Sequence, residues 1–422
     1  MARKISDELN AFVSELKVEP VADENIIKQI RKYKLITPLF GGGAETKKAD
    51  TVKIIRETEI RGQLRFWWRA IRGVGTIKEM SEREAEIFGT SASEKNGNKL
   101  GASKVKVFVK IDKTGAEISK SSNDVPKYAV FPLENHDVLK KGVEFSLEIS
   151  FPKSAKQDIE ATLWAWETFG GIGGRTRRGF GAIQLLQVDE VEVNPPKCNE
   201  VKNYIATNLS IHLAQGNWNI NVPHLSSAID NFACSSPSMM GNTENSIIIW
   251  KNIVDKLHRF RQSPRNEGVY RGESHWSEPD AIRRITRRHA TVNPKDANSK
   301  DRTPSHSVGN KFPRGQLGLP IIFKFKNQDV TNGDPQTQTL QGKDFERLSS
   351  PLILRPIACS DGAVGVGLAL ETPREPLGGV ILKRHPGTVQ TKLDVADIAN
   401  IRPMYNASKT ETDVVKSFLK MI

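Results

Sequence analysis

The chain has few cysteines. Only Cys198, Cys234 and Cys359 occur in 422 residues, and they are odd in number and far apart. None belongs to a CxxC pair, and no histidine stands at a spacing typical of a zinc site. The sequence therefore predicts neither a disulfide framework nor a metal centre, and it fits a reducing, intracellular compartment.

Long apolar runs and export signals are also missing. No uninterrupted apolar stretch approaches the roughly 18 residues that a membrane span requires. The first residues, "MARKISDELNAFVSELK", carry acids where a signal peptide needs an apolar core. We therefore expect a soluble, cytoplasmic protein without a membrane partner.

Familiar catalytic motifs are absent as well. The sequence contains no HxxxH, HExxH or GxSxG motif and no closely spaced pair of aspartates. The eight histidines are scattered, and only His289, beside Arg287 and Arg288, has neighbours that would attract phosphate. We expect no cofactor.

Positive charge, in contrast, is in excess. The chain has 62 lysines and arginines against 49 aspartates and glutamates, which gives a formal net charge of +13. A basic excess of this size points to an anionic partner such as a nucleic acid.

The segment "TEIRGQLRFWWRAIRG", residues 58–73, concentrates this charge. At about 100° per residue, a helix places its four arginines within an arc of roughly 80°. A second stripe, including Trp67, is predicted to enter the core, and Trp68 lies near its border. No acid stands four residues from any of these arginines within the segment. Two interpretations remain open: a solvated face, or a phosphate-binding face.

A second unusual segment is "FGGIGGRTRRGFG", residues 169–181, between a predicted helix and a predicted strand. Its backbone amides could form an anion-binding nest, to which Arg175, Arg177 and Arg178 add charge. A tight helix-to-strand turn is the alternative. It is no Rossmann motif, because the order of helix and strand is reversed. "GGGAETKK" from Gly41 is no P-loop, because Thr46 stands where glycine is required.

Hydrophobic periodicity gives a coarse order of elements. The first half reads strand, helix, strand, strand, helix, strand, which is the ferredoxin-like order. Those six elements are predicted at 31–40, 58–73, 104–111, 143–150, 155–169 and 182–193, with an additional helix at 78–89 and a loop at 112–127. After a linker at 194–200 the pattern predicts helices at 246–262 and 279–290, strands at 319–326, 351–358 and 363–370, and loops at 291–316 and 326–343.

The motifs together resemble a known family. "LITPLFGGGAETKK", "IRGQLRFWWRAIRG" and "GGIGGRTRRGFG" are similar to the RAMP superfamily of CRISPR proteins, and in detail to subunit one of Cmr-type (type III-B) effector complexes. "FPRGQLGLPI" at 312–321 and "RLSSPLILRPIA" at 347–358 resemble the C-terminal half of that subunit family. The resemblance covers most of the chain.

This resemblance implies an α+β chain of two ferredoxin-like, RRM-related domains in tandem, at 1–195 and 196–422, with helical and loop insertions. It implies a non-catalytic, RNA-binding subunit of an antiviral ribonucleoprotein, located at the head near the 3′ part of the guide RNA. The implied partners are the guide CRISPR RNA, single-stranded target RNA and other RAMP subunits.

The resemblance also indicates which residues would bind RNA. Trp68 is a candidate for stacking on a base, and in the second half the helix "RRITRRH" offers Arg283 and Arg287. The remaining candidates come from the matching motifs: Lys47, Lys48, Arg56, Arg61, Arg65, Arg69, Arg175, Arg177 and Arg178.

Two alternatives belong to other classes. Some RAMP relatives are metal-independent endoribonucleases that process CRISPR RNA, a chemistry that needs a general acid and base, with His289 the first candidate here. The basic faces could instead meet acidic protein partners in an assembly role.

Overall fold

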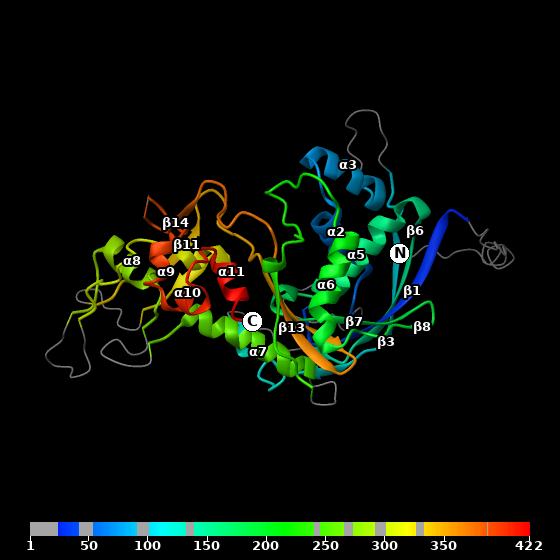
Figure 1. Ribbon diagram of the computed structural model, residues 1–422, viewed down its shortest axis with the longest axis horizontal. Helices are drawn as coiled ribbons and strands as arrows, with labels where there is room; N and C mark the ends of the chain where they lie inside the picture. Colours follow the sequence, from blue (N-terminus) through cyan, green and yellow to red (C-terminus); the bar gives the residue numbers. More distant parts are fainter. Residues whose placement is uncertain are drawn as a thin grey trace, which may run out of the picture.

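The computed structural model describes residues 24–41, 54–90, 101–131, 139–239, 245–265, 273–291, 301–325, 333–385 and 387–422. It combines helices with antiparallel sheets, which confirms the α+β class (Figure 1). No helix in these ranges is long and apolar enough to cross a membrane. Lys47 and Lys48 lie outside the described residues.

The first half is built on a five-stranded antiparallel sheet in the order β3-β6-β1-β7-β8. The first four of these strands have the order expected of a ferredoxin-like unit. Helices α2 and α5 pack against each other on one face of the sheet (Figure 1). The bounds are β1 (Ile26–Leu35), α2 (Glu57–Arg72), β3 (Lys106–Lys113), β6 (Glu144–Pro152), α5 (Lys156–Phe169), β7 (Ile183–Val188) and β8 (Val191–Glu192). The predicted order of elements in this half is confirmed.

Two predicted strands of this half are interrupted. The segment 31–40 divides into β1 and a short β2 (Leu39–Phe40). The segment 182–193 reverses at Asp189 and Glu190, whose φ angles are 49° and 68°. Aspartate tolerates this left-handed conformation, and the Asp189 carboxylate accepts the Ile30 amide at 2.7 Å. A hairpin, β7–β8, therefore replaces one long strand.

Smaller elements complete the first half. Helix α3 (Ile77–Phe88) begins at a capping box in which the Thr76 side chain and Glu79 exchange hydrogen bonds with each other's backbone. The predicted loop at 112–127 contains β4 (Ala116–Ile118), which pairs with β5 (Leu139–Lys141), and β5 pairs with β2. A short helix, α4 (Lys127–Val130), follows β4.

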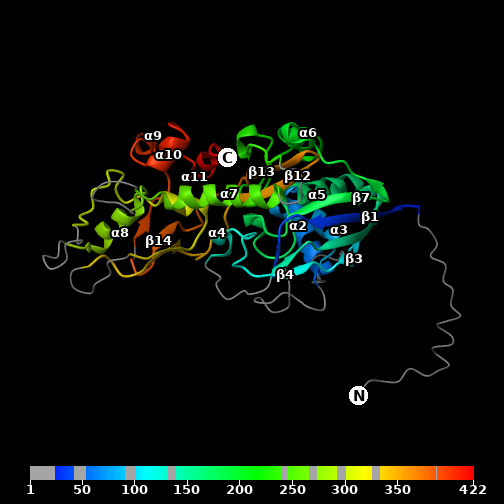
Figure 2. The same ribbon diagram turned by 90° about the horizontal axis from the view of Figure 1, so that it is seen from below.

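The second half contains two smaller sheets, in the orders β12-β13-β9 and β10-β11-β14-β15. Its longest helix, α7 (Asn245–Gln262), packs on β12 and β13 and extends toward the far end of the molecule (Figure 2). The bounds of its other elements are α6 (Val201–His212), β9 (Phe232–Cys234), α8 (Glu278–Thr286), β10 (Ile321–Phe323), β11 (Gln338–Gly342), β12 (Leu352–Cys359), β13 (Gly362–Ala369), β14 (Val380–Leu382), β15 (Thr388–Val389), α9 (Val395–Ile398), α10 (Arg402–Ala407) and α11 (Val414–Leu419).

The sequence predicted this half less well. Helix α7 and strands β12 and β13 lie where they were expected, and β10 occupies part of its predicted segment. Strand β11, however, lies inside the predicted loop 326–343, and α6, β9, β14, β15 and the three C-terminal helices were not predicted. These are short elements, or elements without clear periodicity, so local pattern indicates them weakly.

The hydrophobic core continues across the predicted domain boundary. One cluster joins Trp67 and Trp166 of the first half to Ile205, Ile353 and Val366 of the second. The boundary between 195 and 196 stays a prediction, but it does not coincide with a break in the core.

A buried arginine also joins the two halves. Arg355 of β12 is 2% exposed, and its guanidinium donates to the carbonyl oxygens of Glu167 at 2.9 Å, Gly170 at 2.7 Å and Ile183 at 2.7 Å. Burial lowers the pKa of Arg355 to about 9. The first two carbonyls lie at the C-terminal end of α5, where the helix dipole favours a cation.

We predict that Arg355→Met lowers the free energy of unfolding by about 3 kcal/mol, because it leaves buried carbonyl groups without donors. Urea denaturation measures the change. The control is Arg259→Met on α7, whose side chain is 79% exposed and pairs with Asp255 four residues away. Its effect should stay within about 0.5 kcal/mol. Equal midpoints for the two variants would contradict the anchoring role of Arg355.

Candidate nucleic-acid interface

The arginines of α2 share one face, as predicted, but α3 supplies them with partners. Arg65 Nε and Arg69 Nη1 lie 2.6 and 2.5 Å from the same oxygen of Glu84. Arg61 donates to the carbonyl oxygen of Phe88 at 3.0 Å. The interpretation of this face as unneutralised is therefore wrong, although Arg65 and Arg69 remain about one-third exposed.

The next turn of α2 is tied to α5. Asp158 Oδ1 accepts from Arg72 Nε at 3.1 Å and from the indole nitrogen of Trp68 at 3.0 Å. Trp68 is fully buried, so it is not available to stack on a base, and that prediction is wrong for this structure. Trp67 is buried, as predicted.

The backbone of the glycine loop, residues 170–182, is occupied by internal hydrogen bonds. Ile172 donates to the carbonyl of Gly181 at 2.9 Å, and Gly174 donates to that of Phe40 at 2.7 Å. The Gly173 amide donates to the carboxylate of Glu59. Gly181 has a φ of 58°, and a Cβ there would collide with the Ile172 carbonyl. The amides of Ile172, Gly173 and Gly174 therefore belong to a tight helix-to-strand turn and are not available to an anion.

The three arginines of this loop point toward protein groups. Arg175 donates to the carbonyls of Ala129 at 2.5 Å and Phe131 at 2.9 Å. Arg177 donates to the Ser350 carbonyl and lies over the Phe66 ring. Arg178 lies over Tyr128, and its buried Nη1 has no hydrogen-bond partner in the described part of the chain.

Burial lowers the pKa of all three of these arginines. For Arg178 the pKa falls to about 10, through burial first and then the nearby charge of Arg261. All three side chains are half-buried and stay candidates for RNA contact.

The basic cluster of the second half does not form one helical face. Helix α8 ends at Thr286, and Arg287 follows with a φ of 54° and an exposed side chain. Arg283 is buried and pairs with Asp334 at 2.7 Å and Asp280 at 3.0 Å. Burial lowers the pKa of Arg283, but the two carboxylates outweigh it and raise the pKa overall. Arg283 therefore forms structural ion pairs. Of the two predicted arginines of this cluster, Arg287 stays a candidate for RNA contact.

Arg56 is half-buried at the start of α2. Its charge acts on the carboxylate of Glu59. Arg56 stays a candidate for RNA contact, and it lies near the glycine loop because Glu59 also accepts from the Gly173 amide.

The face of the large sheet opposite α2 and α5 carries a basic surface that the sequence reasoning missed. Alternation along β1 turns Tyr33 and Leu35 toward the helices and leaves the intervening side chains open. Register aligns Lys106 with Ser150 and Lys28, and Lys110 with Ser146 and Lys32. Between these rows lie Phe108, Glu148 and Ile30. We call this surface the open sheet face, and its members are Lys28, Ile30, Lys32, Lys106, Phe108, Lys110 and Glu148.

The open sheet face combines free charge with an exposed ring. Phe108 is 55% exposed and Ile30 is 47% exposed, and the four lysines are exposed. Among the described residues, no carboxylate pairs with any of these lysines. The signal in the sequence was "KVFVK" at 106–110, whose period of two places Lys106, Phe108 and Lys110 on one side of a strand.

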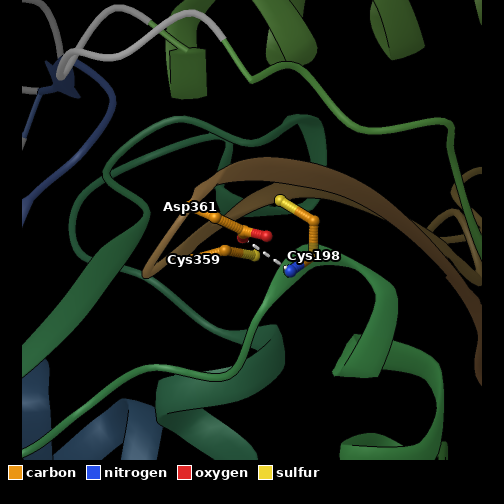
Figure 3. Close-up of side chains that lie close together, drawn as sticks. All are labelled: Cys198, Cys359 and Asp361. Atoms are coloured by element: carbon orange, nitrogen blue, oxygen red, sulfur yellow. Dashed lines mark hydrogen bonds between the residues drawn. The ribbon is translucent and has the colours of Figure 1, made fainter.

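The fold also brings two of the three cysteines together (Figure 3). The Cys198 and Cys359 sulfurs and a carboxylate oxygen of Asp361 lie within 4.8 Å of one another. These are ligand types that Zn²⁺ accepts, although structural zinc sites use four. Burial raises the pKa of both thiols, and the Cys198 amide donates to Asp361 at 2.8 Å. The contact joins the predicted linker to the β12–β13 turn, a proximity that the sequence spacing did not predict.

Comparison with known proteins shows which proteins this chain resembles. Residues 32–184 match the sequence model of the RAMP superfamily. The chain is 25% identical over 189 residues to the CRISPR system Cmr subunit Cmr1-2 of Pyrococcus furiosus, an alignment covering 37% of this chain and 94% of that protein. The predicted resemblance to RAMP proteins and to this Cmr subunit is confirmed.

Solved structures are similar over more of the chain. The apo crystal structure of Cmr1 from Pyrococcus furiosus has a TM-score of 0.48 and 15% identity, covering 85% of this chain and 94% of that one. A chain of the type III-B Cmr-beta complex bound to cognate target RNA has a TM-score of 0.47 and 13% identity, covering 84% and 97%.

Glu59 provides a test of how the glycine loop is held. Burial raises the pKa of its carboxyl above 4.5, although the Gly173 amide and Arg56 oppose the shift. The folded chain therefore holds this proton more tightly than the unfolded chain does. The contribution of Glu59 to stability is present at low pH and is lost as pH rises from about 4.5 through the raised pKa.

We predict that Glu59→Gln removes this pH dependence, because glutamine accepts from Gly173 without titrating. Relative to the variant, the wild type should lose stability with rising pH when urea denaturation is followed over that range. Glu82→Gln, on the exposed side of α3, is the control and should show no such trend. If the free energies of unfolding of the wild type and Glu59→Gln differed by the same amount at every pH, the raised pKa of Glu59 would be contradicted.

Proposed function

We propose that this chain is a non-catalytic, RNA-binding subunit of a type III-B CRISPR effector ribonucleoprotein. In this role it lies in the cytoplasm at the head of the assembly, near the 3′ part of the guide RNA and beside other RAMP subunits. There it helps to capture single-stranded target RNA for antiviral defence. The RAMP match over residues 32–184 and the similarity to a Cmr subunit support the proposal.

The open sheet face is the observation that carries RNA binding. RRM-related sheets bind single strands by stacking bases on exposed aromatics while basic groups contact the phosphates. Phe108 supplies the ring, and lysines lie in the rows on either side of it. The arginines of α2 and the glycine loop are largely engaged with protein groups, so this face offers more free charge.

A second ferredoxin-like unit is part of the proposal. In the second half, β9, α7, β12, β13 and α11 follow one another in the order strand, helix, strand, strand, helix. Their sheet order, β12-β13-β9, corresponds to the second, third and first strands of a ferredoxin-like sheet. The sheet β10-β11-β14-β15 is then built from two insertions in this unit: β10 and β11 lie between α7 and β12, and β14 and β15 lie between β13 and α11.

We predict that changing Lys28, Lys32 and Lys110 together to alanine weakens binding of single-stranded RNA about tenfold or more at low salt. Each phosphate contact on a single strand adds about 0.7 to the slope of log K against log salt, so this slope should decrease by about 2. Native gels with an end-labelled RNA across a salt series measure both quantities.

The matched control changes Lys343, Lys383 and Lys392, which are exposed in the second half, and removes the same charge. If both triple variants lose affinity equally, net charge and not the open sheet face explains binding. Parallel denaturing gels, with magnesium and with EDTA, test catalysis. Discrete cleavage that persists in EDTA would favour the processing endoribonuclease, and His289 would be the first residue to change.

A further inference from the structure

A cavity of about 260 Å³ lies between α2, the glycine loop and the start of β12. It is smaller than the roughly 300–1,000 Å³ typical of sites for drug-sized ligands. Its lining is Gly62, Gln63, Phe66, Trp67, Phe169, Thr176, Arg177 and Ile353.

Gly62 has no structural reason to be glycine. It lies in the middle of α2, where glycine destabilises a helix relative to alanine. A Cβ at this position would have no atom within 4 Å, and the residue does not have a positive φ. Neither close packing nor backbone conformation therefore requires glycine. Its missing side chain keeps space open beside the cavity.

The lining of the cavity is mixed, with aromatic rings beside polar side chains. Phe66 and Phe169 provide aromatic rings, and Trp67 packs edge-on against Phe66. Trp67 is 2% exposed, and its buried indole nitrogen has no hydrogen-bond acceptor among the described residues. That nitrogen lies beside Gly170, where an added Cβ would come within 2.6 Å of it.

A phosphate does not suit this lining. Arg177 is its one cationic group, and this guanidinium already donates to the Ser350 carbonyl and lies over the Phe66 ring. A planar ring with polar groups on its edge matches the aromatic rings of the lining and the polar side chains of Gln63 and Thr176.

We propose that the cavity binds one unstacked nucleobase of the RNA held by this chain. The proposal rests on the RNA-binding function proposed above and adds to it a base-binding site. Phe66 and Phe169 supply apolar surface for the base, Gln63 and Thr176 supply polar groups, and Gly62 leaves space open beside the cavity. Base stacking of this kind tolerates different sequences, because every base has a flat face.

The test fills the cavity without disturbing the fold. Gly62→Phe places a ring in the open space at a helix position that tolerates any L-residue, and Gly62→Ala is the matched control. Both variants should unfold at or above the wild-type temperature. Gly62→Phe should weaken single-stranded RNA binding about fivefold or more with an unchanged salt slope, while Gly62→Ala stays within about twofold.

Photo-crosslinking locates the base. RNA containing 4-thiouridine should crosslink to the peptide that carries Phe66 and Trp67 in the wild type, and Gly62→Phe should lose this crosslink. If Gly62→Phe binds and crosslinks as the wild type does, the nucleobase site is overturned while RNA binding stands. If the wild type binds no RNA, the proposed function fails, and the nucleobase site fails with it.

Discussion

The buried guanidinium of Arg355 is the contact on which the arrangement of the two halves depends. It comes from β12 in the second half and donates to the carbonyl of Gly170, the first residue of the glycine loop, and to that of Ile183, which directly follows the loop. Among the described residues, no carboxylate hydrogen-bonds to it, and carbonyl dipoles at the end of α5 stabilise the charge. By holding both ends of the loop, Arg355 determines where Arg177 and the cavity beside α2 lie.

Arginines of α2 are neutralised by acids that lie far away in the sequence. This explains why the most basic segment of the sequence does not offer the most unpaired charge. Glu84 lies between Arg65 and Arg69, and Asp158 holds Arg72 together with the indole of Trp68. Each acid comes from a different helix that packs against α2. The same packing that makes α2 part of the core reduces its charge, so much of its arginine content stabilises the fold.

The lysines of the open sheet face are in the opposite situation. They extend from strands whose other side chains form the core, and no packed element in the described part of the chain covers them. Lysine is a flexible point charge, suited to following a phosphate backbone, whereas arginine with its planar fork suits fixed ion pairs. In this chain these lysines lie on the surface of the sheet, and the arginines of α2 lie where two elements pack against each other.

The sequence by itself determined the order of elements in the first half, the core stripe of α2 and the family resemblance, because periodicity and motifs are properties of neighbours along the chain. Only the tertiary structure decided which charges are paired. The partners of Arg65, Arg283 and Trp68 are 19, 51 and 90 residues away. It also decided that the amides of residues 172–174 are occupied, that Cys198 lies beside Cys359, and that lysines of separate strands share one open face. Such contacts depend on which distant segments pack together in the fold, and a local sequence pattern does not contain that information.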